Sequence, residues 1–266
     1  MSERSEKEPG WDLGGEIRLG SALFTLVEPH KGHEVAYNRW YERDHFYAGC
    51  MIGPWYFAGR RWVCTRDLKD LRIAGGAPLF GDDRAGSYLA LYWTLKGRFR
   101  DNTDWSTRQV HWLHANGRMF AERDHIHTLL YRHEWTARGR GNGAVPAELA
   151  LDHPFGGLTA TLVRPAEGVS TMAVGDYVRE QLSPELELGF SPIPLPPDAP
   201  VTQQGQDRLD GCLLNLSFTT GAPDSWWDEQ RTAADALVAD GVGEMLWTAP
   251  FVPTIPGTDT YTDQLW

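Results

Sequence analysis

The chain has 266 residues, of which 41% are hydrophobic and 23% charged, and its formal net charge is −11. This composition predicts a folded globular protein of one large or two small domains, and the acidic balance argues against a main role in binding nucleic acid or an anionic membrane. The sequence has no apolar run that could span a bilayer, its N-terminus is polar, and its cysteines, Cys50, Cys64 and Cys212, lack C-x-x-C spacing, so we expect a cytoplasmic protein without a disulfide framework or a metal site.

The first half of the chain shows the order β-α-β-β-α-β. Residues 1–18 are polar and predict a mobile tail. Hydrophobic periodicity predicts strands at 22–27, 55–64, 87–95 and 127–135, helices at 37–47 and 102–116, and a long connection at 66–86. This order predicts a ferredoxin-like domain over residues 19–138.

The pattern then begins again. The pentapeptide T-L-V-R-P at 161–165 repeats T-L-V-E-P at 25–29, and without a gap Gly168 falls on Gly32 and Tyr177 on Tyr41. Such self-similarity indicates an internal duplication. We therefore expect a second ferredoxin-like domain over residues 157–252.

The second half departs from the first in its connections. A Gly-rich stretch begins a predicted linker at 139–156. Strands are expected near 190–195, at 212–218 and at 245–251, with a helix at 224–239, and the prolines at 190–197 predict an edge or irregular strand there. Residues 253–266 are expected to form a C-terminal tail that lies across the other half.

The helix at 37–47 carries the best candidate site. At ~100° per residue, Asn38, Tyr41 and His45 fall within an arc of roughly 60°. A His can accept and return a proton near neutral pH, so His45 is the candidate general base or acid. Tyr41 could donate a hydrogen bond to a developing oxyanion, and Asn38 could orient the substrate or the imidazole. The ordinary alternative is that these residues only pack.

The surroundings of this helix are rich in aromatic side chains. Trp40, Trp55, Trp62 and Trp93 suit a flat hydrophobic ligand, although such rings equally suit a core. The period of two along the strand at 127–135 puts His127, Leu129, Tyr131, His133 and Trp135 on one face. We therefore predict that the ligand-binding residues are Trp40, Trp55, Trp62, Trp93, His127, Tyr131 and His133.

A family resemblance supports this site. F-T-L-V-E-P at 24–29 is followed by Asn38, Trp40, Tyr41 and His45 in the spacing N-x-W-Y-x-x-x-H, and then by G-P-W-Y-F-A-G-R-R-W at 53–62. This run resembles the opening of EthD-like proteins of the dimeric α+β barrel superfamily. The resemblance and the duplication together imply an α+β fold, in which two ferredoxin-like repeats are fused into a pseudo-dimeric α+β barrel.

The resemblance also implies a class of function. Related proteins include cofactor-independent monooxygenases, cyclases and isomerases, so our leading hypothesis is a cofactor-free enzyme that uses His45 to move a proton on a hydrophobic, aromatic or polyketide-like molecule. One alternative is a haem-binding barrel with His45, His127 or His133 as the axial ligand. Another is a non-catalytic binding or accessory protein. We expect a monomeric pseudo-dimer or a homodimer of it.

Overall fold

The computed structural model describes residues 16–76, 78–138, 145–182, 184–194 and 209–266, and it contains both predicted β-α-β-β-α-β units. The elements of the first unit are β1 Leu19–Pro29, α1 Glu34–Trp40, β2 Tyr56–Val63, β4 Tyr88–Leu95, α3 Phe99–Ala115 and β5 Arg123–Arg138. Those of the second are β6 Gly157–Pro165, α4 Thr171–Gln181, β7 Leu186–Ile193, β8 Leu213–Thr219, α5 Trp227–Ala239 and β9 Gly243–Pro253.

The two units build one closed sheet. Their strand orders, β2-β4-β1-β5 and β7-β8-β6-β9, are the same when strands are counted within each half. β5 pairs with β7 from Leu130↔Ile193 to Arg138↔Leu186, and β2 closes the ring by pairing with β9 at Trp62↔Pro253 and Val63↔Val252. The fold is therefore two ferredoxin-like repeats fused into an α+β barrel, as the duplication predicted.

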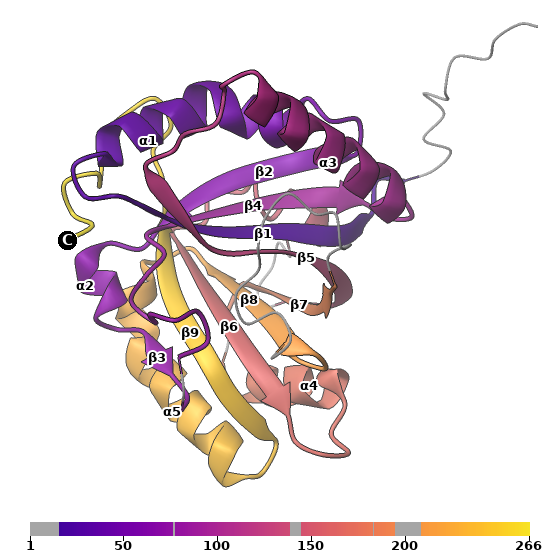
Figure 1. The fold of residues 1–266 in the computed structure, drawn as a ribbon. Coiled ribbons are helices and arrows are strands. Elements are labelled where there is room, and N and C mark those ends of the chain that lie inside the picture. The colour runs from indigo at the N-terminus through magenta and orange to yellow at the C-terminus, as the bar shows by residue number, and fades with distance from the viewer. Residues whose placement is uncertain (1–15, 77, 139–144, 183, 195–208) are drawn as a thin grey trace, which may run out of the picture.

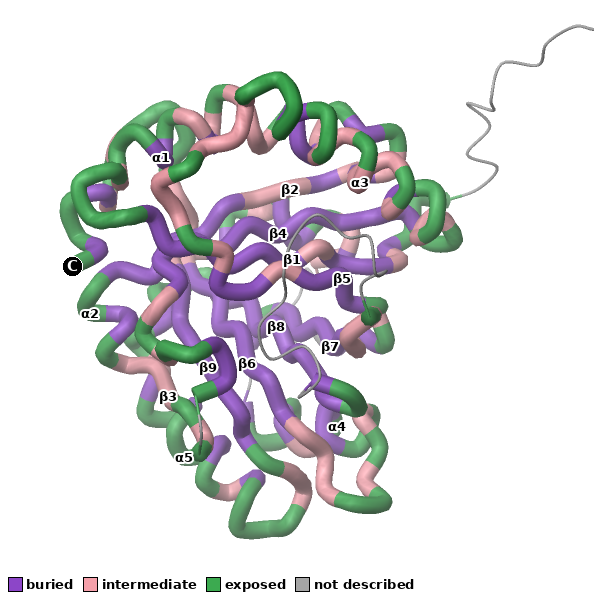
Figure 2. Tube along the Cα trace, in the orientation of Figure 1, coloured by how far each residue is buried: buried purple, intermediate pink, exposed green. Residues whose placement is uncertain are grey.

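The helices lie outside the barrel and the main core lies inside it. α1 and α3 cover the first half, whereas α4 and α5 cover the second, so the two halves of the sheet face each other (Figure 1). Buried residues follow the strands and exposed ones follow the helices and loops (Figure 2). An eight-stranded barrel is just wide enough for side chains to fill, and here it is filled by Phe24, Leu26, Trp62, Trp93, Leu129, Tyr131, Phe190, Phe218, Trp247 and Phe251.

The expectation that proline makes β7 an edge or irregular strand is wrong. β7 pairs with β8 from Leu186↔Phe218 to Phe190↔Leu214, and it pairs with β5 on its other side. Pro192 lies beyond the last β8 pair and faces only Tyr131 of β5. A residue without an N–H group is tolerated there because only one of its two sides joins a ladder.

Two connections are more ordered than the sequence suggested. The long connection after β2 contains a short helix, α2 Arg66–Lys69, and a short strand, β3 Ile73–Ala74, which pairs with β9. The predicted linker lies outside the described residues up to position 144, but its later part carries a 3-10 turn, Ala147–Leu149, and buries Phe155 in the barrel core. Most of the predicted N-terminal tail also lies outside the described residues.

The C-terminal tail lies across the first half, as predicted. The Lys69 Nζ donates to the Leu265 backbone oxygen at 3.2 Å, and the Asn38 side chain donates to that of Thr258 at 2.9 Å. All three cysteines are buried, and none forms a disulfide bond. None of the helices in the described part of the chain combines the length and apolarity needed to cross a bilayer.

Candidate active site

The helix of the predicted site is not a regular α-helix. α1 ends at Trp40 and continues as two π-helical segments, Tyr41–His45 and Tyr47–Met51, in which backbone bonds join residues five apart: the Phe46 amide donates to the Tyr41 oxygen, and the Ile52 amide to the Tyr47 oxygen at 3.1 Å. Short π-helical turns are frequent at functional sites. The wider turn changes which side chains share a face, so the predicted arc of Asn38, Tyr41 and His45 does not hold.

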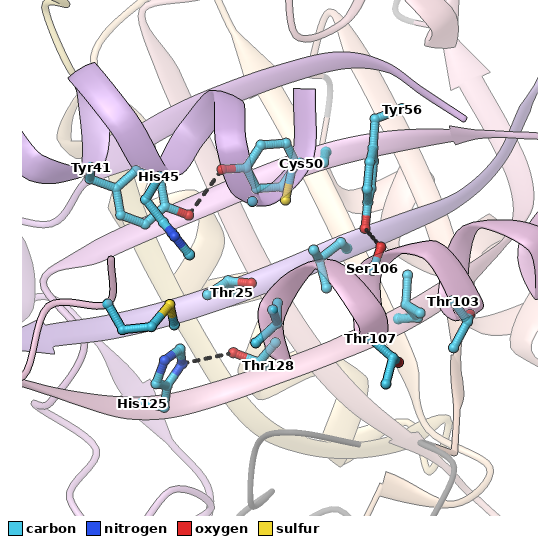
Figure 3. Close-up of a pocket in the computed structure, with 16 residues that line it drawn as sticks. Thr25, Tyr41, His45, Cys50, Tyr56, Thr103, Ser106, Thr107, His125 and Thr128 are labelled. Carbon is cyan, nitrogen blue, oxygen red and sulfur yellow. Dashed lines mark hydrogen bonds between the residues drawn. The ribbon is translucent and has the colours of Figure 1, made fainter. Parts of the chain in front are cut away.

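A cavity of about 120 Å³ lies beneath these turns, between the helices and the outer face of the first-half sheet. Figure 3 shows His45 and Tyr41 reaching it from one side and His125 from another. None of the described residues that line it is Lys, Arg, Asp or Glu. They are Leu23, Thr25, Tyr41, His45, Gly49, Cys50, Tyr56, Tyr92, Thr103, Ser106, Thr107, Val110, Met119, His125, Thr128 and Leu130.

The His45 imidazole is held in a fixed position at this cavity. It stacks on the Trp40 indole, with 4.4 Å between ring centroids and 19° between planes. Trp40 and His45 are five positions apart in the sequence, so on an α-helix their side chains would point in directions about 140° apart. The π-helical turn brings the two side chains onto the same face. A Cβ on Gly49 would approach the His45 Cε1 to 3.1 Å, so the absence of a side chain at Gly49 leaves room for the ring.

One nitrogen of His45 is left without a partner. Its Nδ1 is buried and makes no hydrogen bond to any described residue. Burial, with smaller contributions from nearby Arg123 and His125, lowers the pKa of His45 to about 3. The ring is therefore neutral at physiological pH, with an unsatisfied nitrogen beside an apolar cavity.

Two irregularities in β5 decide which side chains reach the cavity. The first shifts the pairing so that Val27 faces His125 while Leu26 faces His127. His125 thereby turns to the helix side together with Thr128, and His127 turns into the barrel. The second, between His133 and Trp135, turns Trp135 out of the predicted row. Such bulges commonly re-aim side chains near functional sites.

His125 is a second histidine at the cavity, and its hydrogen bonds fix its proton. Its Nε2 lies 3.2 Å from a terminal nitrogen of Arg123, and its Nδ1 lies 3.3 Å from the Thr128 hydroxyl. Because arginine only donates, Nε2 accepts and Nδ1 carries the proton. Burial, followed by the nearby Arg123 charge, lowers the pKa of His125 to about 4, so this ring is also neutral.

Hydroxyl groups line another part of the cavity. The Tyr41 and Tyr92 hydroxyls are 3.0 Å apart, and the Tyr56 hydroxyl is 3.1 Å from that of Ser106. Burial raises the pKa of Tyr41 and of Tyr92, and it raises that of Cys50 to about 12. These groups are therefore protonated at neutral pH and can act as hydrogen-bond donors.

Asn38 does not reach the cavity, which corrects the prediction that it shares a site with His45. Its side chain accepts a hydrogen bond from the buried Arg61 guanidinium at 2.8 Å and donates to the Thr258 backbone. Arg61 also lies 4.5 Å from the Tyr41 ring centroid and 4.9 Å from that of Tyr88. The amide therefore belongs to a structural network that joins α1, β2 and the C-terminal tail.

The predicted ligand-binding residues also lie elsewhere. Trp62, Trp93, His127 and Tyr131 are fully buried in the barrel core, where the His127 Nε2 is 2.8 Å from the Tyr131 hydroxyl. Trp55 packs under Arg98 with 4.5 Å from guanidinium to ring. The His133 Nε2 is 2.9 Å from the Thr136 hydroxyl.

None of the seven predicted ligand-binding residues lines the cavity, and Trp40 adjoins it through its stack on His45. The residues that sequence reasoning missed, such as His125, Thr25 and Ser106, came from three different elements. No group of three or more His, Cys, Asp or Glu side chains that could hold a metal ion occurs among the described residues.

Comparison with known proteins gives similarity in fold alone. No protein-family model and no curated protein matches the chain. Solved structures with a similar fold include a variant of DypB from Rhodococcus jostii in complex with heme, at 7% identity and a TM-score of 0.52, covering 92% of this chain and 96% of that one. A candidate chlorite dismutase has 8% identity and a TM-score of 0.50, with 94% and 100% covered.

A candidate monooxygenase from Fusobacterium nucleatum is also similar, at 7% identity and a TM-score of 0.48, with 90% and 94% covered. The closed α+β barrel of this chain is therefore similar in fold to the heme-bound DypB variant and to the candidate chlorite dismutase. Similarity extends over nearly the whole length of both chains, so both repeats of the barrel take part in it.

Proposed function

We propose that the cavity is the substrate site of a cofactor-independent, EthD-like enzyme that acts on a small, uncharged aromatic molecule by proton transfer through His45. The observation that carries this proposal is the neutral imidazole of His45, which Trp40 and Gly49 fix in position and which lines an apolar cavity. The cavity volume of about 120 Å³ is close to that of an engineered cavity of roughly 150 Å³ that binds benzene.

Different residues of the site carry out different parts of the proposed proton transfer. The imidazole takes a proton from a C–H or O–H group of the ligand, and the electron pair of that bond stays on the ligand as an enolate or phenolate. The Tyr41 and Tyr92 hydroxyls are protonated and hydrogen-bonded to each other, so one of the two has a proton free to donate to such an oxyanion. Cyclisation, isomerisation and oxygenation of aromatic compounds can all begin from this anion.

The low pKa of His45 is compatible with this role. In the empty cavity, burial disfavours the imidazolium. When the proton comes from the ligand, the imidazolium forms beside the new anion, and opposite charges attract strongly where the dielectric constant is low. The pair is therefore stabilised only when a ligand is bound, so that His45 is a base toward its substrate and not toward water.

A general probe for a base in an apolar cavity tests this function. 5-Nitrobenzisoxazole loses its C3 proton to a base while its N–O bond breaks, and it becomes a coloured cyanophenolate. We expect turnover by the wild-type protein and a fall of about 100-fold in His45→Ala, the lower range for removing a general base. His111→Ala, on the exposed face of α3, is the matched control. An unchanged rate in His45→Ala would overturn the proposal.

Binding without turnover would instead favour a non-catalytic binding or accessory protein.

The fold shared with the heme-bound DypB variant makes haem a second candidate. All nine histidines precede residue 154, so only the first half or the connection after it could supply an axial His.

The described cavity does not fit haem. A porphyrin is several times larger than benzene, and the described lining contains no Lys or Arg to pair with its propionates. Expression with ample haem followed by a search for a Soret band tests this alternative directly. A Soret band that disappears in His45→Ala would make His45 an axial ligand and not a base.

A further inference from the structure

The cavity has a neighbour on the protein surface. Thr103 and Thr107, one turn apart on α3, line both the cavity and an outer hollow of about 410 Å³. Figure 3 shows both threonines on the α3 side of the cavity. The outer hollow is completed by Phe99, Arg100, Asp104, Arg108 and Pro194. These two threonines therefore lie between the cavity and the outer hollow.

The charge of this outer region differs from that of the cavity and of the whole chain. Arg100, Asp104 and Arg108 follow at four-residue spacing on α3, beside the stripe of Phe99, Thr103 and Thr107. Arg100 and Arg108 are exposed and form no ion pair with any residue that the structure describes. Two arginines against one aspartate leave this hollow positive in a protein of net charge −11.

A second hollow extends the positive region. It shares Phe99 with the first, includes Ile193 next to Pro194, and is lined by Lys96, Arg132 and Glu134. Together the two hollows present four basic and two acidic side chains around Phe99. A net positive charge beside an apolar cavity attracts ligands of the opposite sign.

We infer that the natural ligand has two parts, an uncharged aromatic head that enters the cavity and an anionic tail, such as a carboxylate, that reaches Arg100 and Arg108 past Thr103 and Thr107. This inference rests on the proposed role of the cavity as a substrate site. It narrows the substrate class from small aromatic molecules to aromatic acids and to aromatics carried on an acidic chain.

Two matched probes test the inference. 4-Phenoxybutanoate and its primary amide have the same head and tail length and differ in the terminal charge. By fluorescence titration at low salt, the wild-type protein should bind the acid about fivefold more tightly than the amide, as expected for two exposed charge contacts. High salt should remove this preference, and so should the double variant Arg100→Gln/Arg108→Gln, whereas Arg231→Gln on α5 should keep it.

Each outcome separates the two proposals. Equal binding of acid and amide, or a preference that survives the double variant, overturns the anionic tail and leaves the cavity as a site. Binding of neither probe overturns both. Preferential binding of the acid together with His45-independent turnover of 5-nitrobenzisoxazole overturns the catalytic role and keeps the two-part ligand.

Discussion

The indole of Trp135 lies directly against Gly189, where an added Cβ would be 2.1 Å from the Trp135 Cε2. The same ring lies against Gly175 of α4, whose added Cβ would be 2.3 Å away. This indole therefore fills the space between helix and sheet in the second half, where the first half has its cavity. The second repeat also has Gln181 at the position of His45, so its described part does not repeat the His45 site.

Replacing Gly189 by Ala should destabilise the protein by about 1–3 kcal/mol, the range for overpacking a core. The new methyl group would overlap an indole that Gly175 confines from the other side. Urea unfolding measures the change. Gly221→Ala is the control, because the nearest atom to its added Cβ is 3.6 Å away. Equal midpoints for wild type and Gly189→Ala would show that Trp135 can move.

A buried carboxyl group in the second half should make stability depend on pH. The Glu187 side chain accepts a hydrogen bond from the Asn215 amide at 2.6 Å, while its Oε2 has no partner among the described residues. Burial raises the pKa of Glu187 from 4.5 to about 7. Between these values the unfolded chain loses the proton and the native protein keeps it, so the free energy of unfolding falls as pH rises.

The size of this effect follows from the two pKa values. Their difference corresponds to about 3 kcal/mol of stability that is present below pH 4.5 and lost above about pH 7. Glu187→Gln should abolish this pH dependence. The free energy of unfolding of the variant minus that of wild type should therefore be larger at pH 8 than at pH 5. Urea unfolding at both pH values measures this, with exposed Glu180→Gln as control. A difference between wild type and variant that does not change with pH would contradict the assignment.

Asn38 should matter for stability and not for proton transfer. Asn38→Ala removes the 2.8 Å hydrogen bond to the buried Arg61, and we expect a loss of about 1–3 kcal/mol. Because the amide points away from the cavity, turnover of 5-nitrobenzisoxazole by the folded variant should stay within about twofold of wild type. A rate loss as large as that of His45→Ala would return Asn38 to the catalytic site.

The sequence by itself determined the repeat and the order of its elements. Hydrophobic alternation marks buried strands such as β4, and the gapless match of T-L-V-R-P to T-L-V-E-P marks equivalent positions: Thr25 pairs with Thr128 in one half as Thr161 pairs with Thr248 in the other. Both features can be read from the sequence, because strand alternation is local and the repeat is found by comparing two segments of the same chain. His45 and Tyr41 were found in the same way, from one short segment.

Only the tertiary structure decided what surrounds them. A π-helical turn has no signature in the spacing of side chains, and it joined His45 to Trp40 while Asn38 faced Arg61. A β-bulge turned His125 to the helix-covered face of the sheet, because one extra residue in a strand moves the following side chains to the opposite face. Trp62 and Trp93 could have lined a ligand site as far as their side chains show. They fill the barrel core because the pairing of β2 with β9 closes the sheet around them.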